Sequence, residues 1–310
     1  MGAVEARGSL ADLDALIGLR LRTGELRSAR SRRARAPVTG MHGSRFRGRG
    51  VDYQESRAYA PGDDIRNMDW RLTARSGRPF TKLFEEERER PVLLMLDTNP
   101  CMRFGTRIRF KSVQAAQLGA LLAWHTVEAG DRIGFLAFGS DRSDLRPRGG
   151  RPGALRSLRA LADSSAPAQS LPEESLSQGL DRARRIARPG TRIVLLTDGA
   201  SWDARSEGLI ARLRQHCDFA LCLISDTLER TPPPPGLYRL GDGEHQVELD
   251  LGRAAVRENW LAHFSGIHQR VVDVAARCGV PWVDVDAAED PVTPLRRLLA
   301  GVERNLRKVA

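Results

Sequence analysis

From residue 91 onward, short apolar runs alternate with longer amphipathic segments. The apolar runs predict buried strands at 91–97, 131–138, 191–199, 218–226 and 280–286. The periodic segments predict helices at 111–130, 153–163, 174–188, 257–279 and 291–308. This alternation predicts an α/β fold with a mostly parallel sheet covered by helices on both faces. Ligands of such sheets bind beyond the carboxyl ends of the strands, where Asp97 and Asp198 fall, so we expect these two side chains to lie close together.

Two other segments do not follow this alternation. The prolines at 232–235 precede "LYRL", a Gly-Asp-Gly turn and "HQVELDL", which predicts a β-hairpin insertion over 231–250 that projects from the sheet. Before the sheet, "RPFTKLFEEERE" is typical of a strand, and with the glycine-rich stretch ahead of it predicts a small β-rich module. We therefore divide the chain into a basic N-terminal arm (1–35), this module (36–90) and the α/β domain (91–310).

The positive charge of the chain is concentrated at its beginning. The first 50 residues hold eleven arginines against four acids, which is +7 of the formal net charge of +10. The arm either solubilises the chain, docks on an acidic partner or binds nucleic acid weakly. Its "SRRARA" run has no interleaved aromatic residues and no recognisable nucleic-acid-binding motif around it, so nucleic-acid binding is not favoured.

The sequence lacks the signatures of secretion, membrane insertion and common catalysis. Acids occupy the place of an apolar signal segment, the longest apolar runs are too short to span a bilayer, and the four cysteines have no C-x-x-C spacing. We therefore expect a cytoplasmic protein without membrane insertion. No lysine follows a glycine, which excludes a P-loop, and neither H-E-x-x-H nor G-x-S-x-G is present. These observations predict that the chain does not hydrolyse ATP.

The stretch from 48 to 77 carries five acids and five arginines among glycine-rich turns. Equal numbers of opposite charges favour a network of hydrogen-bonded ion pairs over a catalytic carboxylate with a perturbed pKa. We expect this network to order the module as a scaffold or interaction surface, with Trp70 as its buried apolar anchor. The other expected members are Arg57, Asp63, Asp64, Arg66, Asp69 and Arg75.

The segments "LLMLDTNPCMRFGT" and "VLLTDG" resemble the metal-ion-dependent adhesion site of von Willebrand factor A domains. In those domains the aspartate and two serines of D-x-S-x-S and the aspartate of T-D-G surround a magnesium ion. Asp97 and Asp198 match the two aspartates, whereas Asn99 and Cys101 stand in the place of the serines. An asparagine carbonyl can bind magnesium, but a thiol suits this ion poorly. The resemblance implies a degenerate site of Asp97, Asn99 and Asp198 with weak or absent magnesium binding, which Cys101→Ser would restore in part.

A longer resemblance runs from about residue 42 to 139 and resumes over 228–251. It rests on "YAPGDDIRNMDW", the "TAR" triplet, the double glutamate before the first strand, and the hairpin segment. In these motifs the chain resembles the bacterial domain of unknown function 58 family, a MoxR-associated, von Willebrand factor A-like group. The resemblance implies a von Willebrand factor A-like (Rossmann-like) fold. It also implies a non-enzymatic adaptor that works with a MoxR-type AAA+ ATPase and other von Willebrand factor A proteins in chaperone-like maturation of a larger complex.

Two alternative functions follow from other features. "LLMLDTNP" resembles the strand that ends in the nucleophilic aspartate of metal-dependent phosphatases of the haloacid dehalogenase kind, although Asn99 stands where their D-x-D motif has its second acid. The basic N-terminus is compatible with a nucleic-acid-associated protein, for which salt-dependent retention on DNA is the test.

Overall fold

The computed structural model describes residues 8–26, 52–60, 63–85, 89–166, 173–241 and 246–309. Contacts divide the chain into two compact units. One unit contains Met1–Ala29 and Arg90–Ala310, and the other contains Arg30–Glu89. Each unit is described by itself below.

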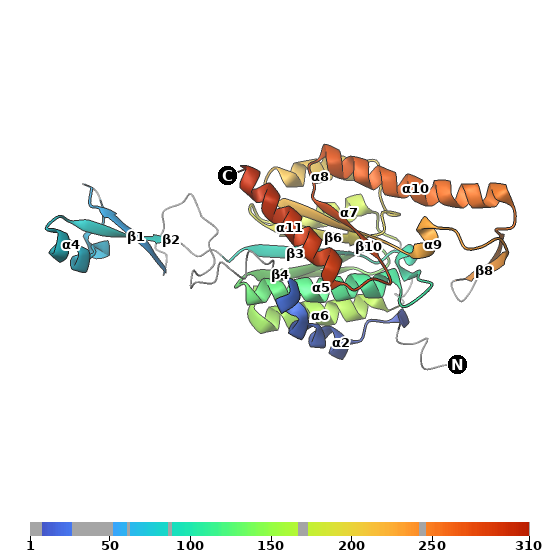
Figure 1. Ribbon diagram of the computed structural model, residues 1–310, viewed down its shortest axis with the longest axis horizontal. Helices are drawn as coiled ribbons and strands as arrows, with labels where there is room; N and C mark the ends of the chain where they lie inside the picture. The colour runs from blue at the N-terminus through green and yellow to red at the C-terminus, as the bar shows by residue number, and fades with distance from the viewer. Residues whose placement is uncertain are drawn as a thin grey trace. The chain divides into compact units, whose positions relative to one another are not determined.

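A six-stranded sheet forms the centre of the larger unit (Figure 1). Its strands are β3 (Pro91–Asp97), β4 (Arg132–Phe138), β5 (Ser143–Gly149), β6 (Arg192–Thr197), β7 (Asp218–Ser225) and β10 (Trp282–Asp286). The strand order is β10-β7-β6-β3-β4-β5. All neighbouring pairs are parallel except β4 and β5, which are antiparallel. The sheet is thus mostly parallel, as the von Willebrand factor A-like prediction requires.

Helices cover both faces of this sheet. The helices of the unit are α5 (Lys111–Glu128), α6 (Gly150–Ser165), α7 (Leu176–Ile186), α8 (Ser206–Arg214), α9 (Thr227–Arg230), α10 (Ala254–Arg277) and α11 (Val292–Val309), with the short 3-10 helix η3 (Pro100–Arg103). One hydrophobic core joins α5, α6 and α11 to the sheet, and a second joins α7, α8 and α10 to its opposite face. Strand β3 supplies both cores, because alternate side chains of a strand point to opposite faces. Leu94 and Leu96 belong to the first core, and Leu93 and Met95 to the second.

The beginning of the chain contains two short helical segments that belong to the α/β unit. Helix α2 (Leu13–Gly18) and the 3-10 helix η1 (Leu19–Leu26) bury Leu16 and Leu26 in the first core. The indole Nε1 of Trp124 in α5 donates a hydrogen bond to the carbonyl of Leu16 at 3.3 Å. The prediction of a free basic arm over 1–35 is therefore wrong for these residues, because their apolar side chains complete the core. The "SRRARA" run lies outside the described residues.

The smaller unit contains a two-stranded antiparallel sheet of β1 (Asp52–Ala58) and β2 (Phe80–Glu85). The 3-10 helix η2 (Ile65–Asn67) and helix α4 (Trp70–Ser76) lie between these strands in the sequence. The carboxylate of Asp69 accepts a hydrogen bond from the amide of Leu72 and caps α4 at its N-terminus, and Gly77 ends the helix with a φ of 68°. The module thus contains the expected strands together with a helix that the sequence patterns did not predict.

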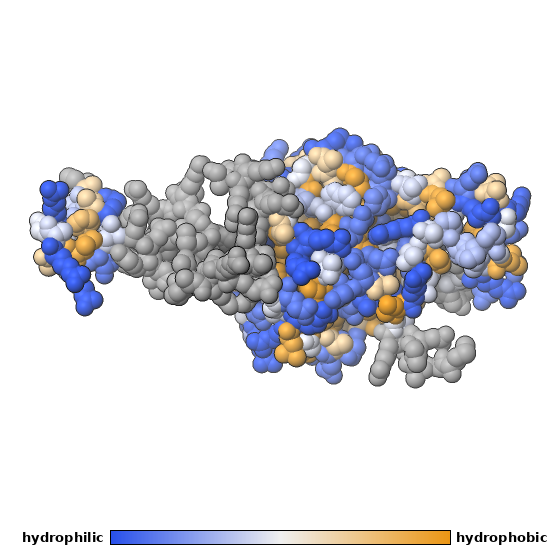
Figure 2. Space-filling model, viewed as in Figure 1, coloured by the Kyte–Doolittle hydropathy of each residue, from blue (hydrophilic) through white to orange (hydrophobic). Residues whose placement is uncertain are grey.

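The predicted hairpin forms a separate two-stranded sheet of β8 (Leu237–Gly241) and β9 (Gln246–Asp250). The prediction that it does not join the central sheet is confirmed, while most of its Gly-Asp-Gly turn lies outside the described residues. Figure 1 shows α10 extending past the sheet towards this hairpin. This part of the molecule presents both hydrophilic and hydrophobic side chains (Figure 2). Among the described residues, no helix has the length and apolar character needed to cross a membrane.

Candidate functional site

Asp97 and Asp198 follow neighbouring strands at the carboxyl edge of the sheet. Strand β3 ends at Asp97, and Asp198 directly follows β6, whose Leu196 is in register with Leu96 of β3. Asp97 is completely buried, and Asp198 raises its pKa electrostatically, so the two carboxylates lie close together as expected. Two buried carboxylates in this arrangement repel each other unless a cation or hydrogen-bond donors lie beside them.

Four donors surround the carboxylate of Asp97. Its Oδ1 accepts hydrogen bonds from the backbone amide of Asn99 at 3.0 Å and from the side-chain amide of Asn99 at 2.8 Å. Its Oδ2 accepts from the hydroxyls of Thr197 at 2.7 Å and Ser201 at 2.6 Å. Burial and Asp198 raise the pKa of Asp97 to about 6, although these donors favour the ionised form. Asn99 therefore acts here as a hydrogen-bond donor.

A lysine supplies the cation of the site. Lys111 is the first residue of α5, and only 2% of its surface is exposed. Its Nζ donates to Asp198 Oδ2 at 2.7 Å and to Glu229 Oε1 at 2.6 Å. Burial lowers the pKa of Lys111, but Asp198 and Glu229 outweigh this effect, so the pKa is raised and the ammonium stays charged at neutral pH.

The residues that flank α9 complete the cluster. Asp226 is the N-cap of α9, and its backbone amide donates a hydrogen bond to Glu229 Oε2 at 2.8 Å, which forms a capping box. Both oxygens of Asp226 also accept hydrogen bonds from Thr106, one from its amide at 3.0 Å and one from its hydroxyl at 2.6 Å. Thr106 and Lys111 thus connect the loop before α5, and the start of α5 itself, to α9. We call the following residues the carboxyl-edge cluster: Asp97, Thr106, Lys111, Asp198, Asp226 and Glu229.

This arrangement does not fit a magnesium ion. Magnesium needs oxygen ligands in near-octahedral geometry, but Lys111 takes one oxygen each from Asp198 and Glu229, and Asp97 is already saturated by donors. Cys101 adds no hard ligand, because its sulfur is a soft donor that suits magnesium poorly. Among the described residues, no group of three or more His, Cys, Asp or Glu side chains has a metal-binding arrangement.

Sequence reasoning missed the lysine and the second acid that it binds. Lys111 follows the "MRFGT" motif closely and opens an otherwise apolar helix, which was a usable signal for a buried charge. The "DTLE" segment has the D-x-x-E spacing of a capping box, which indicated a helix start at Asp226. Neither signal says that Lys111 and Glu229, which lie 118 positions apart, form an ion pair.

In the smaller unit, the expected charge network is only partly present among the described residues. Arg57 and Asp63 form an ion pair at 2.6 Å, whereas Asp64 caps η2 through the amide of Arg66 and Asp69 caps α4. Asp69 also accepts a hydrogen bond from the hydroxyl of Ser56 at 2.7 Å. Arg66 and Arg75 are exposed. Asp64 and Asp69 therefore act as helix caps, and Asp63 is the acid paired with Arg57.

The prediction that Trp70 is a buried anchor is wrong. Trp70 is 63% exposed at the first position of α4. The module has little to bury it against, because a two-stranded sheet and one short helix of seven residues enclose only a small core. Trp70 is instead an exposed aromatic side chain on the surface of this unit.

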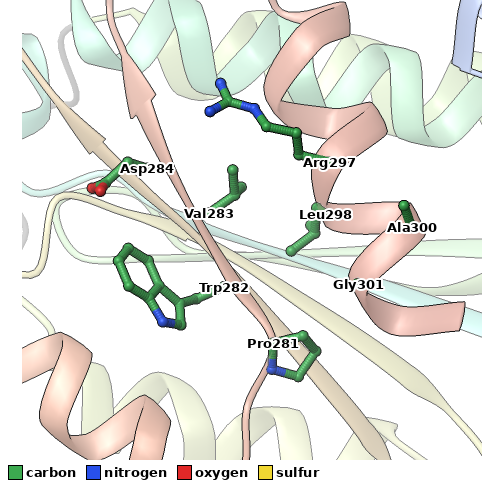
Figure 3. A pocket seen from close by; sticks show the side chains of 8 residues that line it. All are labelled: Pro281, Trp282, Val283, Asp284, Arg297, Leu298, Ala300 and Gly301. Carbon is green, nitrogen blue, oxygen red and sulfur yellow. The ribbon is translucent and has the colours of Figure 1, made fainter. Parts of the chain in front are cut away.

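A hollow of about 460 Å³ lies between β10 and α11, away from the carboxyl-edge cluster. Figure 3 shows its two charged side chains, Asp284 and Arg297, towards one end and Pro281 towards the other. Both charged groups have partners within the chain, His268 for Asp284 at 3.0 Å and Glu289 for Arg297 at 3.1 Å. The hollow therefore offers no converging set of free polar groups for a ligand.

The strand order and the carboxyl-edge position of Asp97 and Asp198 define a von Willebrand factor A-like α/β protein. A protein-family model with the description "Protein of unknown function DUF58" matches residues 55–269, and the chain belongs to this family. The uncharacterized protein Rv1480 of Mycobacterium tuberculosis is 28% identical over 271 residues, which cover 86% of this chain and 84% of that protein.

Several solved structures are similar to the chain, including the following two. BatB from Bacteroides thetaiotaomicron, a conserved hypothetical protein, has a TM-score of 0.48 and 15% identity, with 69% of this chain and 99% of that chain covered. A von Willebrand factor type A protein from Catenulispora acidiphila has a TM-score of 0.35 and 14% identity, with 73% of this chain and 43% of that chain covered. The fold itself is defined by the strand order of this chain.

Proposed function

We propose that the chain is a non-enzymatic, cytoplasmic protein-interaction module that works with a MoxR-type AAA+ ATPase in the maturation of a larger complex. The observation that carries the proposal is the closed carboxyl-edge cluster, in which Asp97, Asp198 and Glu229 all have partners within the chain. A phosphatase of the haloacid dehalogenase kind needs a nucleophilic aspartate that substrate can reach, and Asp97 is completely buried. The partner therefore binds to surfaces around the cluster.

The first half of α10 and the hairpin offer such a surface. Trp260 and Phe264 pack against each other with ring centroids 5.0 Å apart, and Trp260 donates to the carbonyl of Leu228 at 2.9 Å, which attaches α10 to α9. Leu237 and Val247 of the hairpin are exposed. Aromatic and aliphatic side chains of this kind are common at the centre of protein interfaces. We call the hairpin and Ala254–Arg270 the projecting surface.

The test is capture of the ATPase by the full-length chain. The tagged protein is mixed with the MoxR-type ATPase of the same organism in the presence of ADP or a non-hydrolysable ATP analogue. We expect retention that depends on the nucleotide, because AAA+ ATPases change conformation with the bound nucleotide. Retention in neither state contradicts the proposal.

Matched variants locate the interface. Leu237→Asp combined with Val247→Asp places charges on the projecting surface and should weaken retention at least tenfold. Leu21→Asp combined with Leu10→Asp is the control, because both side chains are exposed outside the projecting surface and the two substitutions add the same charge elsewhere. An equal loss of retention in the test variant and the control would mean that the added negative charge weakens binding wherever it is placed.

The same preparation tests the enzymatic alternative. We expect no hydrolysis of p-nitrophenyl phosphate in the presence of magnesium, because Asp97 has no free oxygen for attack. Hydrolysis that disappears in Asp97→Asn would support a phosphatase instead. Retention of the full chain on DNA that falls steeply with salt would support the nucleic-acid alternative.

A further inference from the structure

The position of Lys111 is unusual for this chain. Of its 49 basic residues only three are lysines, Lys82, Lys111 and Lys308. Lys111 is buried, whereas Lys82 is partly exposed, and the Nζ of Lys111 lies 5.9 Å from the ring centroid of Phe104. A buried ammonium is costly unless it is paired and hydrogen-bonded, so its partners must offset the loss of water.

The shape of the cation fits the geometry of its partners. An ammonium is a compact point charge, whereas a guanidinium is a planar fork suited to both oxygens of one carboxylate. Here the cation contacts one oxygen from each of two carboxylates on different elements, Asp198 after β6 and Glu229 in α9. The remaining oxygens of these acids accept backbone amides, Ala200 at 3.0 Å and Asp226 at 2.8 Å. Both carboxylates are thus held in orientations that point one oxygen at Lys111.

We propose that Lys111 is a built-in cation that takes the place of the metal ion at the carboxyl edge of the sheet, so that the edge is ordered independently of divalent cations. Its charge compensates the repulsion among Asp97, Asp198 and Glu229 that a magnesium ion would otherwise have to compensate. Unlike a metal ion with an open coordination position, this ammonium is enclosed by the chain. A partner carboxylate therefore cannot complete the site.

The same lysine positions the elements that follow α9. Lys111 binds Glu229 near the end of α9, and Thr106 binds Asp226 at its start. Helix α9 ends six residues before the first strand of the hairpin, and Trp260 of α10 donates a hydrogen bond to the carbonyl of Leu228. Lys111 is therefore a positioning residue that connects the carboxyl edge to the base of the projecting surface.

The parent protein provides the first test. We expect no saturable binding of magnesium or manganese by calorimetry, and the same melting temperature in EDTA and in millimolar magnesium. Saturable binding of either ion that is lost in Asp97→Ala overturns the proposal. This measurement needs no folded variant at position 111.

Removal of the cation provides the second test. Lys111→Ala leaves buried acids without a counter-ion and opens space beside Asp198 and Glu229, so we expect manganese binding to appear. It should be lost again when Asp198→Ala is added. Lys82→Ala is the control, because it removes a lysine from β2 in the other unit and should bind no manganese. A folded Lys111→Ala protein that binds no manganese contradicts the role of the lysine as a substitute for a metal ion.

Amide hydrogen exchange tests the positioning role of Lys111. In Lys111→Met, which keeps the volume and removes the charge, we expect the amides of Asp226 and Leu228 to exchange at least tenfold faster. Amides of the β1–β2 sheet should be unchanged. Unchanged exchange at α9 overturns the positioning role, whatever the result of the capture experiment with the ATPase.

Discussion

The carboxyl-edge cluster and the smaller unit both contain many charged side chains, but these side chains differ in burial and in their partners. In the cluster, Lys111 is 2% exposed and binds two acids, and Asp97 has four donors. In the smaller unit, Asp64 and Asp69 cap short helices, and Asp63 forms a partly exposed ion pair with Arg57. Charge density in the sequence is therefore a poor guide to the role of a segment, since burial decides how strongly each charge needs a partner.

The physical difference between the two regions is the access of their charged groups to water. Buried ions lose their hydration, so removing one partner leaves an uncompensated charge. In the smaller unit water replaces any lost partner, and exposed ion pairs contribute only about 0–1 kcal/mol. The comparison predicts that single substitutions change the free energy of unfolding strongly in the cluster and weakly in the smaller unit.

The largest expected effect is that of Lys111→Met. Without the ammonium, Asp198 and Glu229 remain buried and unpaired, which should lower the free energy of unfolding by about 3–5 kcal/mol. Urea unfolding followed by circular dichroism measures this difference. Lys82→Met should stay within about 0.5 kcal/mol of the parent, as is usual for surface substitutions. Similar effects of both variants would remove the contrast between the two regions.

The second largest expected effect is the pH dependence of stability that Asp97 causes. Burial and Asp198 raise its pKa from 3.8 in the unfolded chain to about 6, so the folded state favours the protonated form. Its contribution to stability is fully present below the unfolded pKa and is lost as pH rises through the folded pKa. Over this window the parent should lose up to about 3 kcal/mol relative to Asp97→Asn.

Urea unfolding of the parent and Asp97→Asn at intervals from pH 4 to pH 7.5 checks this sign. Subtracting the two curves removes the contributions of the other titrating groups. A parent that gains stability relative to Asp97→Asn as the pH rises would show that the four hydrogen bonds outweigh burial.

A smaller effect is expected for Trp70→Ala. Because Trp70 is 63% exposed, we expect a loss of about 1 kcal/mol in the stability of the smaller unit, where a buried tryptophan would cost about 3–5 kcal/mol. Trp124→Ala is the matched substitution in the α/β unit, since Trp124 is 1% exposed, and should show the full cost. Calorimetric melting of each variant distinguishes them. A loss of 3 kcal/mol or more for Trp70→Ala would mean that this side chain is buried in solution.

The smallest effect is expected for Arg57→Met. The Arg57–Asp63 pair is partly exposed, so its loss should cost no more than about 1 kcal/mol, and the difference should shrink in 1 M salt. Limited proteolysis of the smaller unit at low and high salt measures it. A cost that does not respond to salt would indicate a buried pair.

Several features of the molecule could be predicted from the sequence because they depend on local patterns. Five of the six strands of the central sheet and five helices of the α/β unit follow the hydrophobic periodicity, whereas β5, α8 and α9 were not predicted. The parallel sheet then brings Asp97 and Asp198 to adjacent strand ends. The hairpin follows from the alternation of "LYRL" and "HQVELDL" around a glycine-rich turn. In each case, residues near one another in the chain determine the result.

Only the tertiary structure decided which charges meet and which side chains lose water. Lys111 reaches Asp198 and Glu229, which lie 87 and 118 positions away, because α5, β6 and α9 converge at one edge of the sheet. The packing of Leu16 against the first core and the exposure of Trp70 were equally invisible in the sequence. Burial depends on how much apolar surface the neighbouring elements provide, and this is known only once the elements are assembled.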